Sequence, residues 1–319
     1  MSGIVKRADL RGLRDLEGPG IVRGEPMSRH TTCRIGGPAD LFIEATSADD
    51  LRDIVLAARQ HQVQYFVLGG GSNILVSDAG IRGLVILNKA RRVKFQISNF
   101  ESQIGNAQAE SGVILPTLAR ECIERGLAGL EWAIGVPGTV GGAVVGNAGA
   151  HGSDIAQSLV SASVLDSDGN IRDWSAQEIQ FGYRSSILKS ALRYPAFDLR
   201  PPVVLMAEFE LKQSAREACE ARAVEFTEKR QRSQPPGATI GSMFKNPPGD
   251  YAGRLIEAAG LKGARAGNAE ISNLHANFFV NLGGASAADV YALIVLAREK
   301  VKAMFGVELG LEIQLVGEW

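Results

Sequence analysis

The spacing of apolar residues near the start of the chain predicts a strand, a helix and a second strand in succession. Residues 41–45 and Tyr65–Leu68 are short apolar runs of strand length. Between them, Ser47 is a residue type that favours the start of a helix. The apolar residues after it recur every three or four positions, at Leu51, Ile54, Val55 and Ala58. We therefore expect a β-α-β unit in this part of the chain.

Apolar runs of the same kind continue downstream. They predict strands over residues 84–87, 160–166 and 203–211. A helix is predicted over residues 115–125, because Pro116 is compatible with the first turn of a helix and Gly126 is a typical stop. Glycine-rich segments separate these elements.

The character of the chain changes near residue 212. A charged, alanine-rich stretch over residues 213–232 predicts an exposed helix that ends before Pro235 and Pro236. A strand is then expected over 277–282, a helix after Ser286, and a closing strand over 311–316, whose polar position Glu312 is expected to face solvent. We therefore predict an α+β chain with an extension over residues 1–20, a larger domain over 21–211 and a smaller domain over 212–319.

Composition and charge favour a soluble protein with a small-molecule ligand. The chain of 319 residues has 34 basic and 35 acidic residues, so no charge excess suggests binding to nucleic acid or to a membrane surface. Its three cysteines, Cys33, Cys122 and Cys219, lack the spacing of a disulfide framework or a metal site. No apolar run approaches the length of a membrane span, and we expect a cytoplasmic protein without a metal.

One glycine turn follows a predicted strand directly. Gly69, Gly70, Gly71, Ser72 and Asn73 lack bulky side chains, so successive backbone N–H groups can converge on an anion such as a diphosphate. The turn has neither the lysine of an ATP-binding phosphate loop nor the following helix of an NAD-binding fingerprint. A tight turn that merely connects two strands is an equal alternative.

A second glycine cluster lies over residues 135–152. It holds seven glycines and no charged residue. Ordering so many glycines is costly in entropy, so we expect something bulky to approach the main chain there, the alternative being a buried loop with left-handed turns. A third turn, over residues 31–38, carries Arg34, which either faces a phosphate or flavin or lies on the surface. Together the turns suggest an extended dinucleotide, and flavin is the natural candidate.

Several polar residues remain open to more than one interpretation. Ser242 lies in a turn over residues 241–247 and lacks the flanking sequence of a hydrolytic nucleophile, which leaves a hydrogen-bond or proton donor, or a simple helix cap. His275 is more often a structural residue than a catalyst. Arg184 and Glu312 carry no signal of their own.

Taken in order, these segments resemble the UDP-N-acetylenolpyruvoylglucosamine reductase family. The resemblance covers roughly residues 26–317 and rests on residues 31–40, 69–73, 135–152, 183–186, 241–247, 272–281 and Glu312. It implies a two-lobed FAD-binding domain of the PCMH or vanillyl-alcohol-oxidase type followed by a smaller α+β substrate domain. The short distance from Tyr183 to the strand at Val203 is similar to the family's second type, which lacks an inserted tyrosine-bearing loop.

The resemblance also implies an activity and site residues. NADPH reduces non-covalently bound FAD, and the enolpyruvyl ether of a UDP-linked amino sugar then accepts a hydride at C3 and a proton at C2. By matching positions, Arg184 stabilises the developing enolate, Ser242 donates the proton and Glu312 assists as an acid. The matching cofactor residues are Arg34, Gly69, Gly70, Gly71, Ser72, Asn73, Gly135, Gly138, Asn147 and Gly149. The matching substrate residues are Lys245, Asn246, Arg254, Lys262 and His275.

Two features depart from the family pattern, and two other functions compete. Leu188 stands where an aromatic residue is usual, and the connection over residues 189–202 is long, which puts the coverage of the substrate in doubt. The competing functions are an FAD-linked oxidase or dehydrogenase of small alcohols and a flavin-binding or nucleotide-sugar-binding module without activity. We expect a monomer or a weak dimer.

Overall fold

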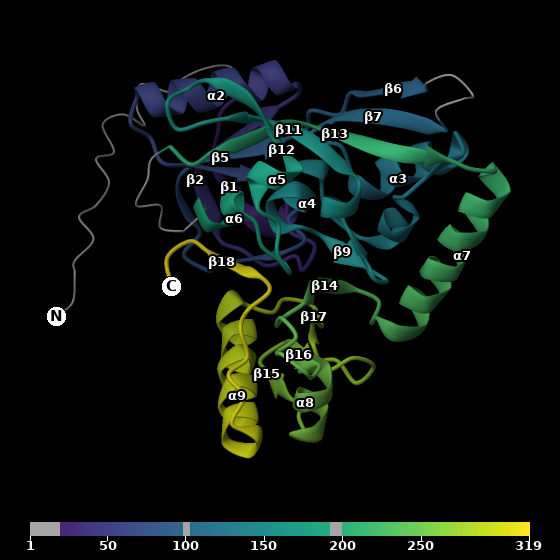
Figure 1. Cartoon of the computed structure of the whole chain (residues 1–319). Coiled ribbons are helices and arrows are strands. Elements are labelled where there is room, and N and C mark those ends of the chain that lie inside the picture. Colours follow the sequence, from purple (N-terminus) through teal and green to yellow (C-terminus); the bar gives the residue numbers. More distant parts are fainter. Residues whose placement is uncertain (1–19, 98–102, 192–199) are drawn as a thin grey trace.

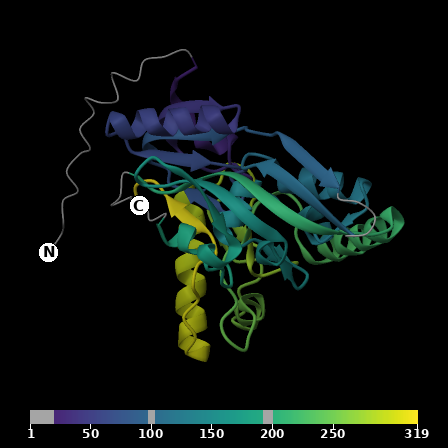
Figure 2. The same ribbon diagram turned by 45° about the horizontal axis from the view of Figure 1, so that its top comes forward.

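The described chain folds into two lobes and a C-terminal part, seen from two directions in Figures 1 and 2. The computed structural model describes residues 20–97, 103–191 and 200–319. The extension predicted for residues 1–20 therefore lies outside the described residues except for Gly20, and so does most of the long connection predicted over 189–202.

The first lobe is a four-stranded sheet in the order β1-β2-β5-β3, with β1 antiparallel to β2 and the other pairs parallel. The helix predicted after Ser47 is α2 (Ala48–Gln60), and the Ser47 side chain accepts a hydrogen bond from the Asp50 N–H. The two strands that α2 joins are not neighbours, because β5 lies between them. The strands and short helix of this lobe are β1 (Val22–Pro26), η1 (Met27–Arg29), β2 (Pro38–Ala45), β3 (Tyr65–Leu68), β4 (Ile74–Val76) and β5 (Ile81–Asn88).

The second lobe is an antiparallel sheet in the order β12-β11-β13-β7-β6, with β8 also paired to β13. Its longest strand, β13, is buried at alternate positions up to Phe209 and Leu211. The strands are β6 (Val93–Ile97), β7 (Ile104–Glu110), β8 (Leu127–Ala128), β11 (Leu159–Leu165), β12 (Ile171–Ser175) and β13 (Val203–Gln213).

Helices cover one side of this second sheet, and one of them lies within the glycine cluster. The alternative of a buried loop does not hold over residues 140–146, which form α4, packed on the sheet through Val140 and Val144. Asn147 ends α4 with a left-handed backbone, φ 45°. The other elements are α3 (Leu115–Glu124), η2 (Glu131–Gly135), β9 (Gly149–Ala150), β10 (Ser153–Asp154), η3 (Ile155–Gln157), α5 (Ala176–Ile179) and α6 (Ile187–Ala191).

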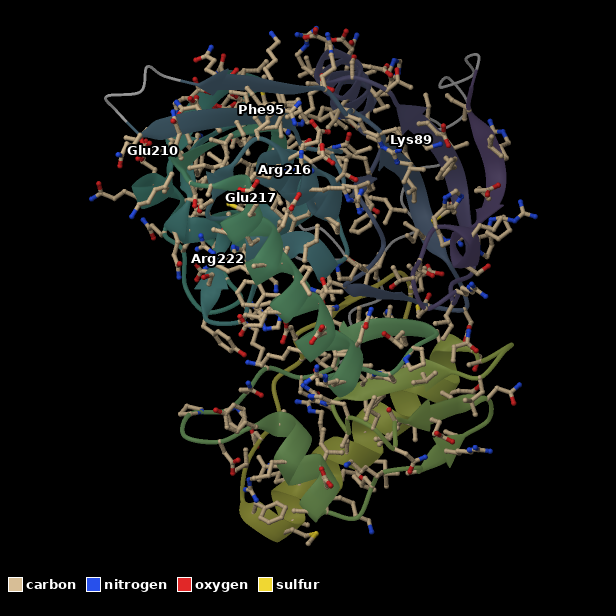
Figure 3. The ribbon with its side chains drawn as sticks, turned by 90° about the vertical axis from the view of Figure 1, so that its right-hand side faces the viewer. Lys89, Phe95, Glu210, Arg216, Glu217 and Arg222 are labelled. Carbon is tan, nitrogen blue, oxygen red and sulfur yellow. The ribbon has the colours of Figure 1, made fainter. Side chains whose placement is uncertain are left out.

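Helix α7 (Arg216–Ser233) leads from the second lobe to the C-terminal part, and Figure 3 shows it with Arg216, Glu217 and Arg222 labelled. It is mostly exposed, as its charge predicts, but Cys219 and Ala223 are buried against the second lobe. The Arg222 guanidinium also lies 3.5 Å from the Glu131 carboxylate of η2. The domain boundary at residue 212 stays a prediction.

The C-terminal part is a small sheet in the order β14-β17-β16-β15, packed against two helices. The helix predicted after Ser286 is α9, and Ser286 forms a capping box with Asp289. The elements are β14 (Ala238–Ser242), α8 (Ala252–Ala258), β15 (Arg265–Ala266), β16 (Ala269–Ile271), β17 (Phe278–Asn281), α9 (Ala287–Phe305) and β18 (Gln314–Val316).

The C-terminal part is joined to the first lobe along several contacts. Strand β18 pairs in parallel with β4, so the end of the chain returns to the upper part of the molecule in Figure 1. The C-terminal core includes Cys33, Ile35 and Leu75 from the first lobe. In addition, the Asp78 carboxylate accepts hydrogen bonds from the first two backbone N–H groups of α9. These contacts fix the C-terminal loops relative to the glycine turn that precedes β4.

Candidate active site

The three glycine turns predicted from the sequence meet in space. The Thr32 N–H donates to the Gly71 carbonyl over 3.1 Å, and the Ser72 hydroxyl donates to the Pro137 carbonyl over 3.1 Å. A Cβ atom added at Gly70 would lie 3.0 Å from the Cα of Gly138. Main chain therefore approaches main chain here, which gives these glycines a structural reason in addition to any ligand.

A cavity opens beside the meeting point of the turns. Its volume is about 490 Å³, within the range of small-molecule sites. The lining includes one cation, Arg230, and no carboxylate. The lining residues are Thr32, Pro137, Arg230, Gln231, Gln234, Pro235, Pro236, Gly237, Thr239, Gly241 and Phe278.

Arg184 and Glu312 form an ion pair between the second lobe and the C-terminal segment. The Arg184 Nε donates to the Glu312 Oε1 over 2.6 Å, and its Nη2 donates to the Gly149 carbonyl over 2.6 Å. The expectation that Glu312 faces solvent is wrong, since its side chain is 15% exposed. The reason is that the predicted strand begins only at Gln314, so strand alternation does not orient residue 312.

Ser242 lies next to this pair through the backbone. It ends β14, directly after Gly241, whose φ of 84° is left-handed. The following residue, Met243, accepts a hydrogen bond from the Glu312 N–H over 3.0 Å. Among the described residues no hydrogen bond to the half-buried Ser242 hydroxyl is found, so this group is available to a ligand.

Asn73 connects the first glycine turn to the same place. Its Nδ2 donates to the Glu312 carbonyl over 3.2 Å, and its own carbonyl accepts from the Gln314 N–H over 2.9 Å. Four segments that are distant in the sequence thus meet around Glu312.

Comparison with known proteins identifies the family. Residues 232–316 match the UDP-N-acetylenolpyruvoylglucosamine reductase C-terminal domain, and residues 39–175 match an FAD binding domain. The UDP-N-acetylenolpyruvoylglucosamine reductase of Rubrobacter xylanophilus is 45% identical over 94% of this chain and 96% of its own length. That of Chloroflexus aggregans is 43% identical over 92% of this chain and 96% of its own length. The chain belongs to the UDP-N-acetylenolpyruvoylglucosamine reductase family.

A solved member of the reductase family has the same fold. The crystal structure of UDP-N-acetylenolpyruvylglucosamine reductase from Thermus caldophilus covers 92% of this chain and 98% of its own, with 34% identity and a TM-score of 0.74. The predicted resemblance and the predicted α+β fold with an FAD-binding domain are therefore confirmed. As a member of this family the protein is an oxidoreductase.

The other residues matched to the cofactor side of the reductase family have defined places in the fold. Arg34 has a left-handed backbone, φ 58°, in the turn beside Gly71. Asn147 is buried, and its Nδ2 donates to the Asp154 carboxylate over 3.2 Å and to the Gly182 carbonyl over 3.1 Å. The Asn147 amide therefore holds the hairpin β9–β10 against the segment that carries Arg184. Gly135 packs against the stem of Arg230.

The substrate-side residues fall into two groups. The Lys245 N–H donates to the Gly310 carbonyl, and the Asn246 Oδ1 accepts from the Ala252 N–H at the start of α8. These two residues directly follow Phe244 in the chain, and Ser242 lies three positions before Lys245.

The second group lies around α8. Arg254 pairs with Asp250 and lowers the pKa of that carboxyl to about 2, while Lys262 pairs with Glu257. Burial lowers the pKa of His275, whose Nδ1 accepts from the Asn277 N–H. His275 connects this group to Ser242, because its carbonyl accepts a hydrogen bond from the Phe278 N–H over 2.9 Å and Phe278 is paired with Ser242 between β17 and β14. The role of the group in substrate binding stays a prediction.

Sequence reasoning missed Lys189. This side chain is partly buried in α6, and its Nζ donates to the Arg184 carbonyl over 3.1 Å. Burial lowers the pKa of the Lys189 ammonium, and the charge of Lys245 lowers it further. Nothing in the sequence distinguishes this lysine from a surface lysine of the long connection.

Two absences hold for residues 20–97, 103–191 and 200–319. Within them no cluster of three or more histidine, cysteine, aspartate or glutamate side chains is placed to hold a metal ion. No helix in the same ranges has the length and apolar character required to cross a membrane.

Proposed function

We propose that this protein reduces the enolpyruvyl ether of UDP-N-acetylglucosamine enolpyruvate to UDP-N-acetylmuramate, with FAD as its bound cofactor and NADPH as reductant, in the cytoplasmic stage of peptidoglycan synthesis. The observation that carries the proposal is the convergence of Arg184, Glu312 and the segment of Ser242 beside the turn at Asn73. Family membership supports the substrate class, because the relatives from Chloroflexus aggregans and Rubrobacter xylanophilus are UDP-N-acetylenolpyruvoylglucosamine reductases.

The residues around the cavity fit a flavin dinucleotide. Gly241 lines the cavity with a left-handed backbone, and no atom lies within 4 Å of a Cβ added there, so a planar ring or a phosphate has room to approach the main chain. The single cation in the lining, Arg230, suits an electron-rich ligand, and no lining carboxylate would repel one. When bound, FAD supplies hydride transfer from NADPH to C3 of the enolpyruvyl group.

Arg184 is proposed to bind the carboxylate of the enolpyruvyl group. Its guanidinium is fixed by Glu312 on one nitrogen and by the Gly149 carbonyl on another, so its orientation is set before the substrate enters. A preorganised cation stabilises the negative charge that develops on this carboxylate as the C2–C3 double bond is consumed. Glu312 thus orients the arginine and lies at the reacting end of the site.

Ser242 is proposed to deliver the proton to C2. The hydroxyl has no hydrogen-bond partner among the described residues, and Ser242 ends β14 directly after Gly241, whose φ is 84°. A new C3–H bond and a new C2–H bond then replace the π bond. Positioned proton donors of this kind typically contribute about a hundredfold or more to the rate.

An anaerobic experiment with two half-reactions tests the function. The purified protein should show oxidised-flavin absorbance that NADPH bleaches, and UDP-N-acetylglucosamine enolpyruvate should restore it while a product heavier by two hydrogens forms. If the sugar nucleotide leaves the reduced flavin unchanged and only oxygen restores the colour, the proposal is wrong and the oxidase alternative gains support.

A further inference from the structure

Lys189 contacts the backbone of the residue proposed to hold the substrate carboxylate. Its Nζ donates to the carbonyl of Arg184, five positions earlier, over 3.1 Å. Arg184 lies in the tight turn closed by two hydrogen bonds between Gly182 and Ser185, and its φ of 52° is left-handed. A left-handed backbone is strained for a non-glycine residue, so the surrounding contacts must hold Arg184 in this conformation.

The short helix that carries Lys189 is itself anchored. The Lys189 N–H donates to the Ser186 hydroxyl over 3.1 Å, and that hydroxyl donates to the Val145 carbonyl of α4 over 2.6 Å. Leu188 is buried in the core of the second lobe, with 1% of its surface exposed. Leu188 therefore anchors α6 in the core, where other members of the family usually have an aromatic residue. This packing fixes the position of the backbone from which the Lys189 side chain reaches Arg184.

Cations outnumber anions among Lys189 and the charged groups that interact with it. Lys189 interacts electrostatically with three groups, Lys245, Glu312 and Arg184, which come from three different segments. Three of these four side chains are cations and only Glu312 is an anion. A second anion entering beside Arg184 would meet this excess of positive charge, and a substrate carboxylate is such an anion.

We propose that Lys189 is a positioning residue, whose ammonium holds the Arg184 carbonyl so that the guanidinium meets Glu312, and whose charge favours entry of the substrate carboxylate. This inference rests on the proposed function. It assigns Lys189 no contact with the reacting carbons.

Replacement of Lys189 by methionine, which is similar in length but carries neither charge nor donor, tests the inference in the full-length flavoprotein. We expect reoxidation of the reduced flavin by UDP-N-acetylglucosamine enolpyruvate to slow at least about tenfold, equivalent to about 1.4 kcal/mol. Bleaching by NADPH should stay within about twofold of wild type, because nicotinamide presents no carboxylate to Arg184. Lys302→Met is the matched control, since Lys302 is an exposed lysine of α9 that pairs with Glu308.

Lys189→Arg separates positioning from bulk packing, because it keeps a charge and a donor. It should restore reoxidation to within about threefold of wild type. In the wild type, the reoxidation rate should fall at alkaline pH as Lys189 loses its proton, and burial lowers the pKa of this ammonium. In Lys189→Arg this fall should move to higher pH, because a guanidinium stays charged. The neighbouring charged groups Arg184, Glu312 and Lys245 are the same in both proteins.

The outcomes distinguish the two proposals. Wild-type reoxidation in Lys189→Met, equal slowing of both half-reactions, or no recovery in Lys189→Arg would each overturn the role of Lys189 and leave the proposed function standing. A wild-type protein that the enolpyruvyl sugar fails to reoxidise would overturn both.

Discussion

Replacement of Ser242 by alanine should change the chemistry without changing the fold. No hydrogen bond to its hydroxyl is found among the described residues, so alanine leaves no buried partner unpaired. We therefore expect the free energy of unfolding to stay within about 0.5 kcal/mol of wild type. Loss of a positioned proton donor should slow flavin reoxidation by about a hundredfold to ten-thousandfold, which raises the activation free energy by about 2.7–5.5 kcal/mol.

Stopped-flow absorbance measures the two half-reactions of the Ser242 variant separately. Bleaching by NADPH should proceed at close to the wild-type rate, since no proton is delivered to carbon in that step. Ser242→Cys is a matched variant, because a thiol is a stronger acid than a hydroxyl and should recover part of the lost rate. Equal slowing of both half-reactions, or an unfolding midpoint well below wild type, would refute the assignment.

Three further predictions concern stability and cofactor binding. Asp78→Ala removes the hydrogen bonds to the first turn of α9, so the free energy of unfolding should fall by about 1 kcal/mol. Amide hydrogen exchange at Ala287 should become faster, and an unchanged exchange rate would contradict this prediction. Burial lowers the pKa of His275 in the folded protein, so as the pH falls the unfolded state takes up this proton before the folded state does. The free energy of unfolding should therefore decrease as the pH drops through about 6.5. Denaturant titrations of His275→Gln should show a weaker dependence of this free energy on pH. Gly70→Ala should separate the turn from Gly138 and weaken FAD binding by about 1–3 kcal/mol, measured by flavin fluorescence; wild-type affinity would contradict the close packing.

The elements with local signals could be predicted from the sequence. Helix α2 begins after Ser47 and α9 begins after Ser286 as expected, because a capping side chain and an apolar stripe act within a few residues. Strand β3 has the predicted bounds, Tyr65–Leu68. Helix α4 was missed, because its glycines have low helix propensity and its stability comes from packing on the sheet.

The site could be predicted residue by residue but not as an arrangement. Arg184 and Glu312 are 128 positions apart, and nothing in either local sequence indicates their ion pair. They were selected only by resemblance to a family. Lys189 had no such signal, because its significance depends on a backbone carbonyl that the fold turns towards it.

The parallel pairing of β18 with β4 has a consequence for the order of assembly during synthesis. Leu75 cannot pair with Leu315 until residue 315 has left the ribosome, because the two residues are 240 positions apart in the sequence. Contacts of such long separation form slowly, since closure of a long loop costs entropy before any pairing is gained. Premature termination before residue 314 would therefore remove the hydrogen bond from the Gln314 N–H to the Asn73 carbonyl and leave the glycine turn at Asn73 without this support.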